Sequence, residues 1–336
     1  MGKLSMYGLS GSGKSCYIFG MAQALSQGVL LNNGKYLTVI CPDPRQVVKL
    51  NKAYSMMSTG KWPDGNIESV DYSFNCRLAM DKLMNFVITD YRGGLLNTDD
   101  EDDFEDQRNL FDSFNGSNVL MFFIGADMVK AAMSGSNFES ASNLAFMNTL
   151  YENYLDVSHN AKTPIMIVIT KSDLLSESEK PVAKKYVYNF FRAFFGAGTN
   201  LTTAITMVTL GKNLSNYGGE LEGELRIGPT EGNIQIPILF SLFCVISNEI
   251  EESIGKLQTA QGDYDSAQGA LKREMGRSAF ARFFNSNEAS IKQQISSASN
   301  VIGTQKGKLS KLMDTLTFIK PLLLNGADLY INGIKQ

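Results

Sequence analysis

The chain has 336 residues, of which 43% are hydrophobic and 19% charged, and its formal net charge at pH 7 is −3. These values predict a globular protein of one or two domains without the basic field that attracts nucleic acid, so we expect no nucleic-acid partner. No apolar run reaches the roughly 18 residues of a membrane span, and we expect no signal peptide, because the first expected strand already starts at residue 3. The four cysteines show neither metal-ligand spacing nor a pairing pattern, which favours a reducing, cytoplasmic location.

Expected strands and helices alternate along most of the chain. Apolar runs predict strands at residues 3–7, 36–41, 70–75, 86–89, 119–125, 165–170 and 204–208. Helices are predicted at residues 14–26, 44–57, 102–114, 137–157 and 180–195. Such alternation is typical of an α/β domain with a mostly parallel sheet flanked by helices, whose strand ends gather motifs into one crevice. The Gly- and Asn-rich residues 210–235 are expected to form a long surface connection before a last helix that begins at Pro237.

A phosphate-binding pattern, G-x-x-x-x-G-K-[ST], matches residues 8–15, between the first expected strand and helix. Its glycines allow backbone N–H groups to form an anion nest, Lys14 supplies a charge for the β- and γ-phosphates, and the hydroxyl of Ser15 can bind Mg²⁺. A Gly/Ser-rich turn with a chance lysine is the alternative. The expected phosphate-binding residues are Gly8, Ser10, Gly11, Ser12, Gly13, Lys14, Ser15 and Cys16.

The segment NFVITDYRGG, residues 85–94, places a carboxylate directly after an apolar strand. At the tip of a buried strand beside the phosphate loop, Asp90 can hold Mg²⁺ through water. Asp90 also begins the pattern D-x-x-G, in which the N–H of Gly93 can sense a γ-phosphate. Arg92, inside this pattern, either contacts phosphate or is a solvated charge. The acidic residues 99–106 that follow are more simply a solvated segment than a metal site.

The segment PIMIVITKSDLL, residues 164–175, ends a buried strand in Thr-Lys-Ser-Asp. The carboxylate of Asp173 can accept hydrogen bonds from N1–H and the 2-amino group of guanine, whereas adenine would leave it desolvated without a partner. Thr170 belongs to the same motif, and the aliphatic stem of Lys171 can lie along the base. A polar turn after a strand is the alternative. Residues 209–212 could close the base pocket, which adds Leu210 and Gly211 to the expected base site.

Together these motifs resemble a TRAFAC-class, Ras-like P-loop GTPase. The resemblance covers roughly residues 3–248 and implies a P-loop GTPase domain at 1–248 that binds GTP or GDP with Mg²⁺. Residues 60–63, Gly-Lys-Trp-Pro, are more narrowly similar to bacterial double-GTPase-type proteins of conflict or signalling systems, in which G-x-W-P-x-G-T precedes the strand that carries the metal-binding aspartate.

Two positions depart from the family pattern. Asn66 stands where a switch threonine is expected, and Gly94 stands where Ras-like enzymes carry a water-orienting glutamine. The resemblance implies metal ligation by Ser15, Asp90 and Asn66, and catalytic roles for Lys14, Arg92 and Gly93. The vacancy at Gly94 indicates a protein that needs help from a partner to hydrolyse GTP.

Beyond residue 248 the composition changes, and apolar side chains recur every three and four residues, in a weaker series at 250–275 and a stronger one at 291–319. This spacing predicts that residues 249–336 form a C-terminal helical hairpin, similar to a coiled coil. We expect the hairpin to pack back on the α/β domain rather than form a free arm. Pro321 is expected to end its second helix, because proline has no N–H for a continuing helix.

Two functions follow from these residues. The first is a GTP-binding switch with slow intrinsic or partner-stimulated hydrolysis, whose protein partner would dock through the switch region or the C-terminal helices. The second is an adaptor module of a larger assembly, in which the nucleotide is structural. An ATP-using kinase conflicts with the guanine motif at residues 170–173.

Overall fold

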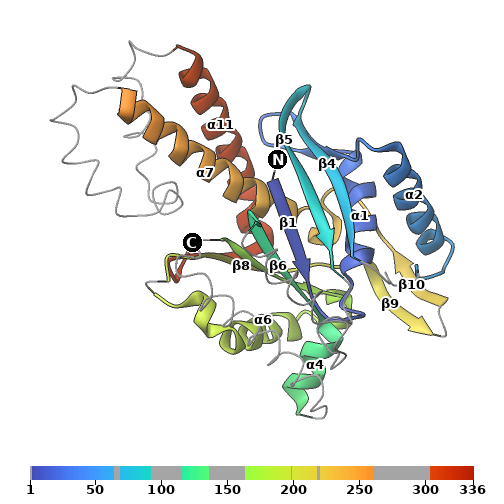
Figure 1. Ribbon diagram of the computed structural model, residues 1–336. Coiled ribbons are helices and arrows are strands. Elements are labelled where there is room, and N and C mark those ends of the chain that lie inside the picture. Colours follow the sequence, from blue (N-terminus) through green and yellow to red (C-terminus); the bar gives the residue numbers. More distant parts are fainter. Residues whose placement is uncertain are drawn as a thin grey trace, which may run out of the picture.

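The computed structural model describes residues 2–63, 69–91, 116–135, 163–197, 199–217, 220–260 and 303–336. These residues form a ten-stranded sheet in the order β12-β11-β8-β7-β6-β1-β5-β4-β3-β2 (Figure 1). The strands are β1 (Gly2–Tyr7), β2 (Val29–Leu30), β3 (Tyr36–Ile40), β4 (Val70–Leu78), β5 (Asp81–Asp90), β6 (Val119–Gly125), β7 (Ile165–Thr170), β8 (Thr202–Met207), β11 (Ala327–Ile331) and β12 (Ile334–Lys335).

The centre of the sheet is parallel and its two margins are antiparallel. Strands β5, β1, β6, β7 and β8 pair in parallel, whereas β4, β3 and β2 continue one margin and β11 and β12 the other in antiparallel pairs. Every residue of β6 and β7 is buried, as expected for parallel strands covered on both faces. The predicted α/β class with a mostly parallel central sheet is therefore confirmed.

Helices cover both faces of the sheet. One core joins the sheet to α1 (Lys14–Ser26), α7 (Ile236–Ala260) and α11 (Gly303–Gly326), and α2 (Pro44–Ser58) adds to it beside α1. The other core joins the sheet to α4 (Ala126–Ser134) and α6 (Glu179–Phe190). Alternate residues of β6 serve the two cores, with Phe123 in the first and Phe122 in the second. The helix predicted at 180–195 ends earlier than expected and is followed by a short 3-10 turn, η4 (Arg192–Phe195).

The prediction of a long surface connection at residues 210–235 is wrong. The chain there forms an antiparallel hairpin of β9 (Gly211–Tyr217) and β10 (Glu220–Leu225). Gly223 lies at a bulge of this hairpin with φ of +97°, and a Cβ atom there would collide with the backbone of Asn213. Glycine at this position therefore serves a tight bulge and not a loose loop.

The prediction that Pro321 ends the second C-terminal helix is also wrong, because α11 continues to Gly326. Pro321 is exposed, while Ile319 and Leu323 on either side of it are fully buried. Burial of this apolar face offsets the hydrogen bond that proline cannot make. The helical prediction for 249–336 also fails at its end, because the residues after Gly326 form β11, which pairs with β8 and extends the main sheet.

The two C-terminal helices pack on each other and on the sheet. Ile250 of α7 and Leu309 and Leu316 of α11 belong to the same core as the strands. Helix α7 also crosses the predicted domain boundary at residue 248 without a break. In Figure 1 the two helices extend side by side away from the sheet, and the predicted turn and heptads between residues 261 and 302 lie outside the described residues.

Further predictions fall outside the part of the chain that the structure describes. These are the helices expected at residues 102–114 and 137–157 and the acidic run at 99–106. Within the described residues, none of the helices combines the length and the apolar character that a membrane crossing requires.

Candidate nucleotide-binding site

The loop between β1 and α1 depends on glycine at two points. Gly13 is the residue that caps α1 and has φ of +85°, a left-handed conformation that disfavours a side chain. At Gly8 a Cβ atom would collide with the carbonyl oxygen of Phe123 in β6. The loop therefore winds tightly against the sheet and leads directly into a helix N-terminus, an arrangement that favours anions.

Lys14 is folded into this loop. Its Nζ donates hydrogen bonds to the carbonyl oxygens of Gly8 (2.6 Å) and Leu9 (3.2 Å), and the residue is only 6% exposed. Burial lowers the pKa of Lys14 to about 8, although the nearby carboxylate of Asp90 partly offsets this effect. The ammonium group thus stays charged at neutral pH and lies inside the loop.

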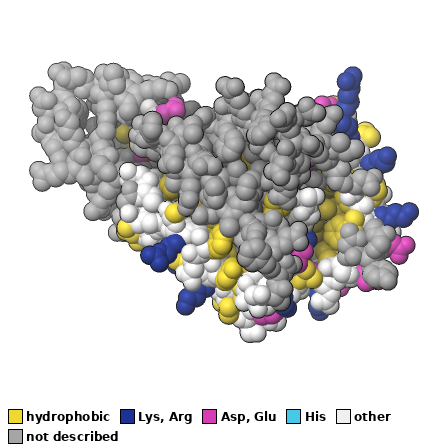
Figure 2. Space-filling model, turned by 60° about the horizontal axis from the view of Figure 1, so that its bottom comes forward, with side chains coloured by type: hydrophobic (Ala, Val, Ile, Leu, Met, Phe, Trp, Pro, Cys, Tyr) yellow, Lys and Arg dark blue, Asp and Glu magenta, His cyan; other side chains and the backbone are white. Residues whose placement is uncertain are grey.

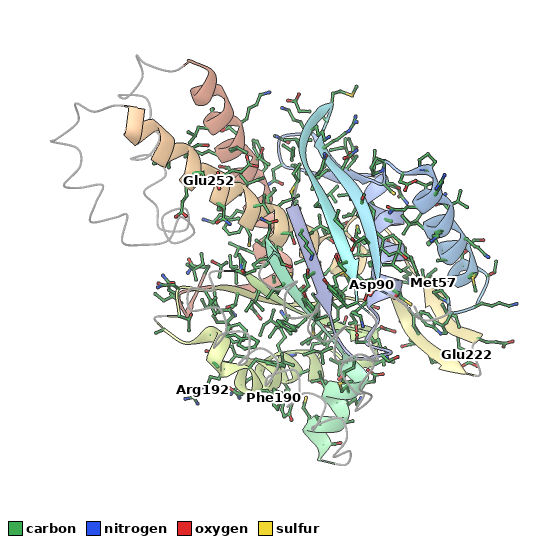
Figure 3. The ribbon with its side chains drawn as sticks, viewed as in Figure 1. Met57, Asp90, Phe190, Arg192, Glu222 and Glu252 are labelled. Carbon is green, nitrogen blue, oxygen red and sulfur yellow. The ribbon has the colours of Figure 1, made fainter. Side chains whose placement is uncertain are left out.

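Ser15 and Asp90, separated by 75 residues in sequence, lie in direct contact. The Ser15 hydroxyl donates to Oδ2 of Asp90 at 2.6 Å, and Asp90 ends β5 directly beside Met6 of β1. Figure 3 labels Asp90 at the carboxyl end of β5. A hydroxyl and a carboxylate are hard oxygen donors, and Mg²⁺ commonly takes one or two such protein ligands together with phosphates. These two residues therefore fit a magnesium ion, whereas Asn66, the third predicted ligand, lies outside the described residues.

The phosphate loop carries one further polar group that is buried. Ser12 is 2% exposed, and its Oγ has no hydrogen-bond partner among the described residues. Burying a hydroxyl without a partner costs free energy, which makes this group a candidate donor to a bound phosphate. Ser10 and Gly11 are exposed in the same loop. Burial raises the pKa of the Cys16 thiol to about 11, which disfavours the thiolate that a nucleophile requires.

Thr170 connects the phosphate loop to the predicted base motif. Its Oγ1 donates to the carbonyl oxygen of Ser12 at 2.6 Å, and its side chain lies against Gly13. This hydrogen bond spans 158 residues of sequence. The first residue of the Thr-Lys-Ser-Asp motif therefore braces the loop expected to hold phosphate.

Asp173 is held by two donors from later in the chain. Its Oδ1 accepts from the hydroxyl of Thr209 at 2.8 Å, and its Oδ2 accepts from the backbone N–H of Leu214 in β9 at 2.6 Å. The Thr209 hydroxyl in turn accepts from the backbone N–H of Gly211 at 3.1 Å. Sequence reasoning placed residues 209–212 near the base but missed Leu214, because no strand was expected there.

Two other residues predicted to contact the base, Lys171 and Leu210, contact residues of neighbouring helices. Lys171 forms an ion pair of 2.6 Å with Asp127 of α4, a residue that the sequence analysis did not single out. Leu210 packs its side chain against Gly20 of α1 and therefore serves the core as well as the loop. The predicted catalytic residues Arg92 and Gly93 lie outside the described residues.

Comparison with known proteins finds similarity to solved structures only, at low sequence identity. No protein-family model matches the chain, and no curated protein sequence matches it. Among solved structures it is similar to the SRb-GTP/SRX complex of the signal recognition particle receptor from Chaetomium thermophilum, at 11% identity and a TM-score of 0.37, over 62% of this chain and 90% of that one. It is also similar to a Plasmodium falciparum protein described as nucleolar GTP-binding protein 1, at 12% identity and a TM-score of 0.33, over 77% of this chain and 93% of that one.

A third similar structure is the bacterial selenocysteine-specific elongation factor EF-Sec, at 13% identity and a TM-score of 0.30. The match covers 62% of this chain and 26% of that one. At such identities and TM-scores these similarities carry no functional argument. The function is therefore argued from the residues of the site.

Proposed function

We propose that this protein binds guanine nucleotides as a P-loop GTPase-type switch, with slow intrinsic or partner-stimulated hydrolysis of GTP. The observation that carries the proposal is the hydrogen bond from Thr170 to Ser12, since it joins the base motif to the phosphate loop. One ligand with a base and phosphates at its two ends fits that juxtaposition. The narrower similarity to bacterial double-GTPase-type proteins rests on residues 60–63 and belongs to the same proposal.

Each end of the nucleotide has its own set of groups. The backbone N–H groups of residues 8–16 and the ammonium of Lys14 bind the phosphates, and Ser12 adds its buried hydroxyl. Asp173 accepts from N1–H and the 2-amino group of guanine, and Lys171 covers the face of the base. When bound, Mg²⁺ would neutralise phosphate charge, and Ser15 and Asp90 are the residues that would hold it.

Hydrolysis places demands that binding does not. The transition state requires an oriented water and stabilisation of phosphoryl charge. In the proposal Lys14, Arg92 and the N–H of Gly93 supply the charge stabilisation, while Gly94 brings no side chain to orient water. A partner that docks through the switch region or the C-terminal helices would then complete the site, as an arginine finger does.

A nucleotide-dependent adaptor is the second candidate function. Helices α7 and α11 extend together from the sheet in Figure 1 and offer a surface for assembly. On the face drawn in Figure 2, the basic side chains of the described residues lie dispersed around the rim and form no single patch. On that face the described residues therefore offer no basic patch for a phosphate backbone.

Nucleotide binding and phosphate release on the full chain test both candidates. Calorimetric titration should give GTP and GDP affinities at least about 100-fold above that of ATP, because the adenine base leaves Asp173 without a donor. Equal affinity for ATP and GTP would refute guanine binding. Equal affinities for GTP and GDP with no phosphate release would leave only the adaptor, since equal affinities shift no population.

A further inference from the structure

The β9–β10 hairpin contacts two separate parts of the molecule. On one side, the N–H of Leu214 donates to Oδ2 of Asp173 at 2.6 Å. On the other, the carbonyl oxygen of Ser215, the next residue, accepts from the indole Nε1 of Trp62 at 3.0 Å. Two neighbouring residues of β9 therefore connect the predicted base carboxylate to a tryptophan 111 positions earlier in the chain.

The second strand of the hairpin strengthens the contact with the tryptophan segment. The N–H of Leu221 in β10 donates to the carbonyl oxygen of Gly60 at 2.8 Å, and Lys61 forms a β-bridge with Glu220. The hairpin lies next to α2, from whose end this segment emerges (Figure 1). Residues 60–62 are thus held by both strands of the hairpin.

The hydrogen bonds of Asp173 leave room for guanine. An ionised carboxylate offers about four acceptor positions, two on each oxygen. Thr209 and Leu214 occupy one position on each oxygen, which leaves two for the two donors on the edge of guanine. A carboxylate fixed at both oxygens loses little further freedom when the base arrives, so its orientation favours binding.

We propose that the β9–β10 hairpin positions Asp173 for guanine and couples occupation of the base site to the environment of Trp62; this inference rests on the proposed guanine-nucleotide function. Coupling between two sites is reciprocal. If the anchored hairpin strengthens guanine binding, then bound guanine strengthens the anchoring of the hairpin to residues 60–62. Leu214 and Trp62 act as positioning residues through Asp173 and do not themselves touch the nucleotide.

Trp62 is the sole tryptophan of the 336 residues, so the tryptophan emission of the intact chain comes from this side chain alone and reports on its surroundings. In a titration with GDP, the emission should change saturably, with the same Kd that calorimetry gives. Inorganic pyrophosphate, which fills the phosphate loop and carries no base, should bind without changing the emission. GDP binding without an emission change, or an equal change with pyrophosphate, would overturn the coupling.

Variants test the positioning role separately. Trp62→Phe keeps an aromatic ring but removes the donor to Ser215, and Leu214→Pro removes the N–H that reaches Asp173. Each should weaken GDP binding about fivefold or more while leaving pyrophosphate binding unchanged. The matched control is Glu222→Gln, because this exposed side chain contacts only the Ser215 hydroxyl among the described hydrogen bonds (Figure 3). GDP affinity in Trp62→Phe within twofold of the wild type would overturn the positioning role.

The outcomes separate the inference from the function on which it rests. If calorimetry detects no guanine-nucleotide binding, the proposed function and the coupling fail together. If GDP binds but leaves the Trp62 emission of the wild type unchanged, and Trp62→Phe binds GDP as the wild type does, only the hairpin inference fails. Because Trp62→Phe leaves the backbone of the hairpin intact, it decides the question even if proline at position 214 prevents folding.

Discussion

At the scale of single residues, Lys14 shows how ligand binding and stability can separate. Its ammonium is buried in the phosphate loop, and burial lowers its pKa to about 8. A lowered lysine pKa means that the folded protein holds this charge at a cost in free energy. The position is therefore suited to a ligand more than to the stability of the chain.

We expect Lys14→Ala to weaken GDP binding about 10- to 100-fold, because hydrogen bonds to charged groups contribute roughly 1.5–3 kcal/mol. The melting temperature should stay within a few degrees of the wild type, because a costly buried charge disappears. Calorimetry and thermal unfolding measure the two effects. Wild-type GDP affinity in this variant would contradict the phosphate-binding role of the loop.

The contacts of Asp173 predict a mixed outcome for Asp173→Asn. An amide suits the 2-oxo group of xanthine, so preference should shift from GDP to XDP. The amide replaces one of the two carboxylate oxygens by an N–H₂ group, so either Thr209 or Leu214 loses the acceptor to which it now donates. We therefore expect GDP affinity to fall about 10- to 100-fold, and XDP affinity to stay below that of wild type for GDP. Unchanged preference for GDP in a competition assay would refute base reading by Asp173.

At the scale of elements, α11 continues through Pro321 because the packing of its apolar face outweighs the cost of a proline inside a helix. Pro321 is exposed within the helix, whereas Ile319 and Leu323 face the core. An interior proline removes one backbone hydrogen bond and costs up to about 3 kcal/mol. Helix continuation here is a tertiary effect.

Pro321→Ala should raise the free energy of unfolding by about 1–2 kcal/mol, since it restores the N–H while losing some of the stiffness that proline gives the unfolded chain. Urea denaturation measures the change. Asn325→Ala, at another exposed position of the same helix, is the control and should have a small effect. A destabilised Pro321→Ala protein would contradict the cost assigned here to the missing backbone N–H.

The C-terminal strand β11 is fastened by charge as well as by pairing with β8. Oδ1 of Asp328 lies 2.7 Å from Nζ of Lys335, and its Oδ2 lies 3.2 Å from Nζ of Lys184. Partial burial alone would raise the pKa of Asp328, but the hydrogen bond from Lys335 and the charge of Lys184 lower it below its ordinary value. The stabilisation is present above the unfolded pKa of about 3.9 and is lost as pH falls through the lower, folded pKa.

Asp328→Asn should therefore lower the free energy of unfolding by about 0.5–1 kcal/mol at neutral pH. The difference from wild type should begin to shrink as the pH falls below about 5 and should vanish only below the lowered, folded pKa of Asp328. Asp81→Asn is the matched control, because Asp81 lies 3.2 Å from Lys311 but both side chains are about 70% exposed. A loss at Asp81 equal to that at Asp328 would contradict the role of partial burial.

At the scale of the whole molecule, the proposed site has more residues suited to bind a nucleotide than residues suited to catalyse its hydrolysis. In the proposed function, the phosphate loop, the Ser15–Asp90 pair and Asp173 bind the nucleotide before hydrolysis. Gly94 offers no side chain to orient water, and Asn66 replaces the expected switch threonine. Transition-state stabilisation would then have to come partly from a partner.

We expect the isolated chain to hydrolyse GTP at about 10⁻³ s⁻¹ or more slowly, as unassisted Ras-like enzymes do. Single-turnover phosphate release measures this rate, and Lys14→Ala prepared in the same way controls for contaminating phosphatases. A rate near 1 s⁻¹ for the isolated chain would mean that the protein supplies its own catalytic group, for example Arg92.

Local chemistry made the phosphate loop, the central strands and the base motif predictable from the sequence. Their signals lie in short stretches, because glycines at fixed spacings, a lysine at a helix start and continuous apolar runs act within one loop or strand. The order of these motifs also indicated that Asp90 would lie beside the loop at the carboxyl ends of neighbouring strands. The class of fold followed from these patterns and is confirmed, whereas the nucleotide-binding roles of the site residues stay predictions.

Only the tertiary structure decided how these parts are connected. The hairpin that holds Asp173, the ion pair of Lys171 with Asp127, and the pairing of β11 with β8 all join residues at least 41 positions apart. The individual segments resemble ordinary polar loops or a helix end, since their stabilising partners lie elsewhere in the chain. Long-range burial and pairing outweigh local propensity at these places, which is why a Gly-rich connection becomes a strand and a helix runs through a proline.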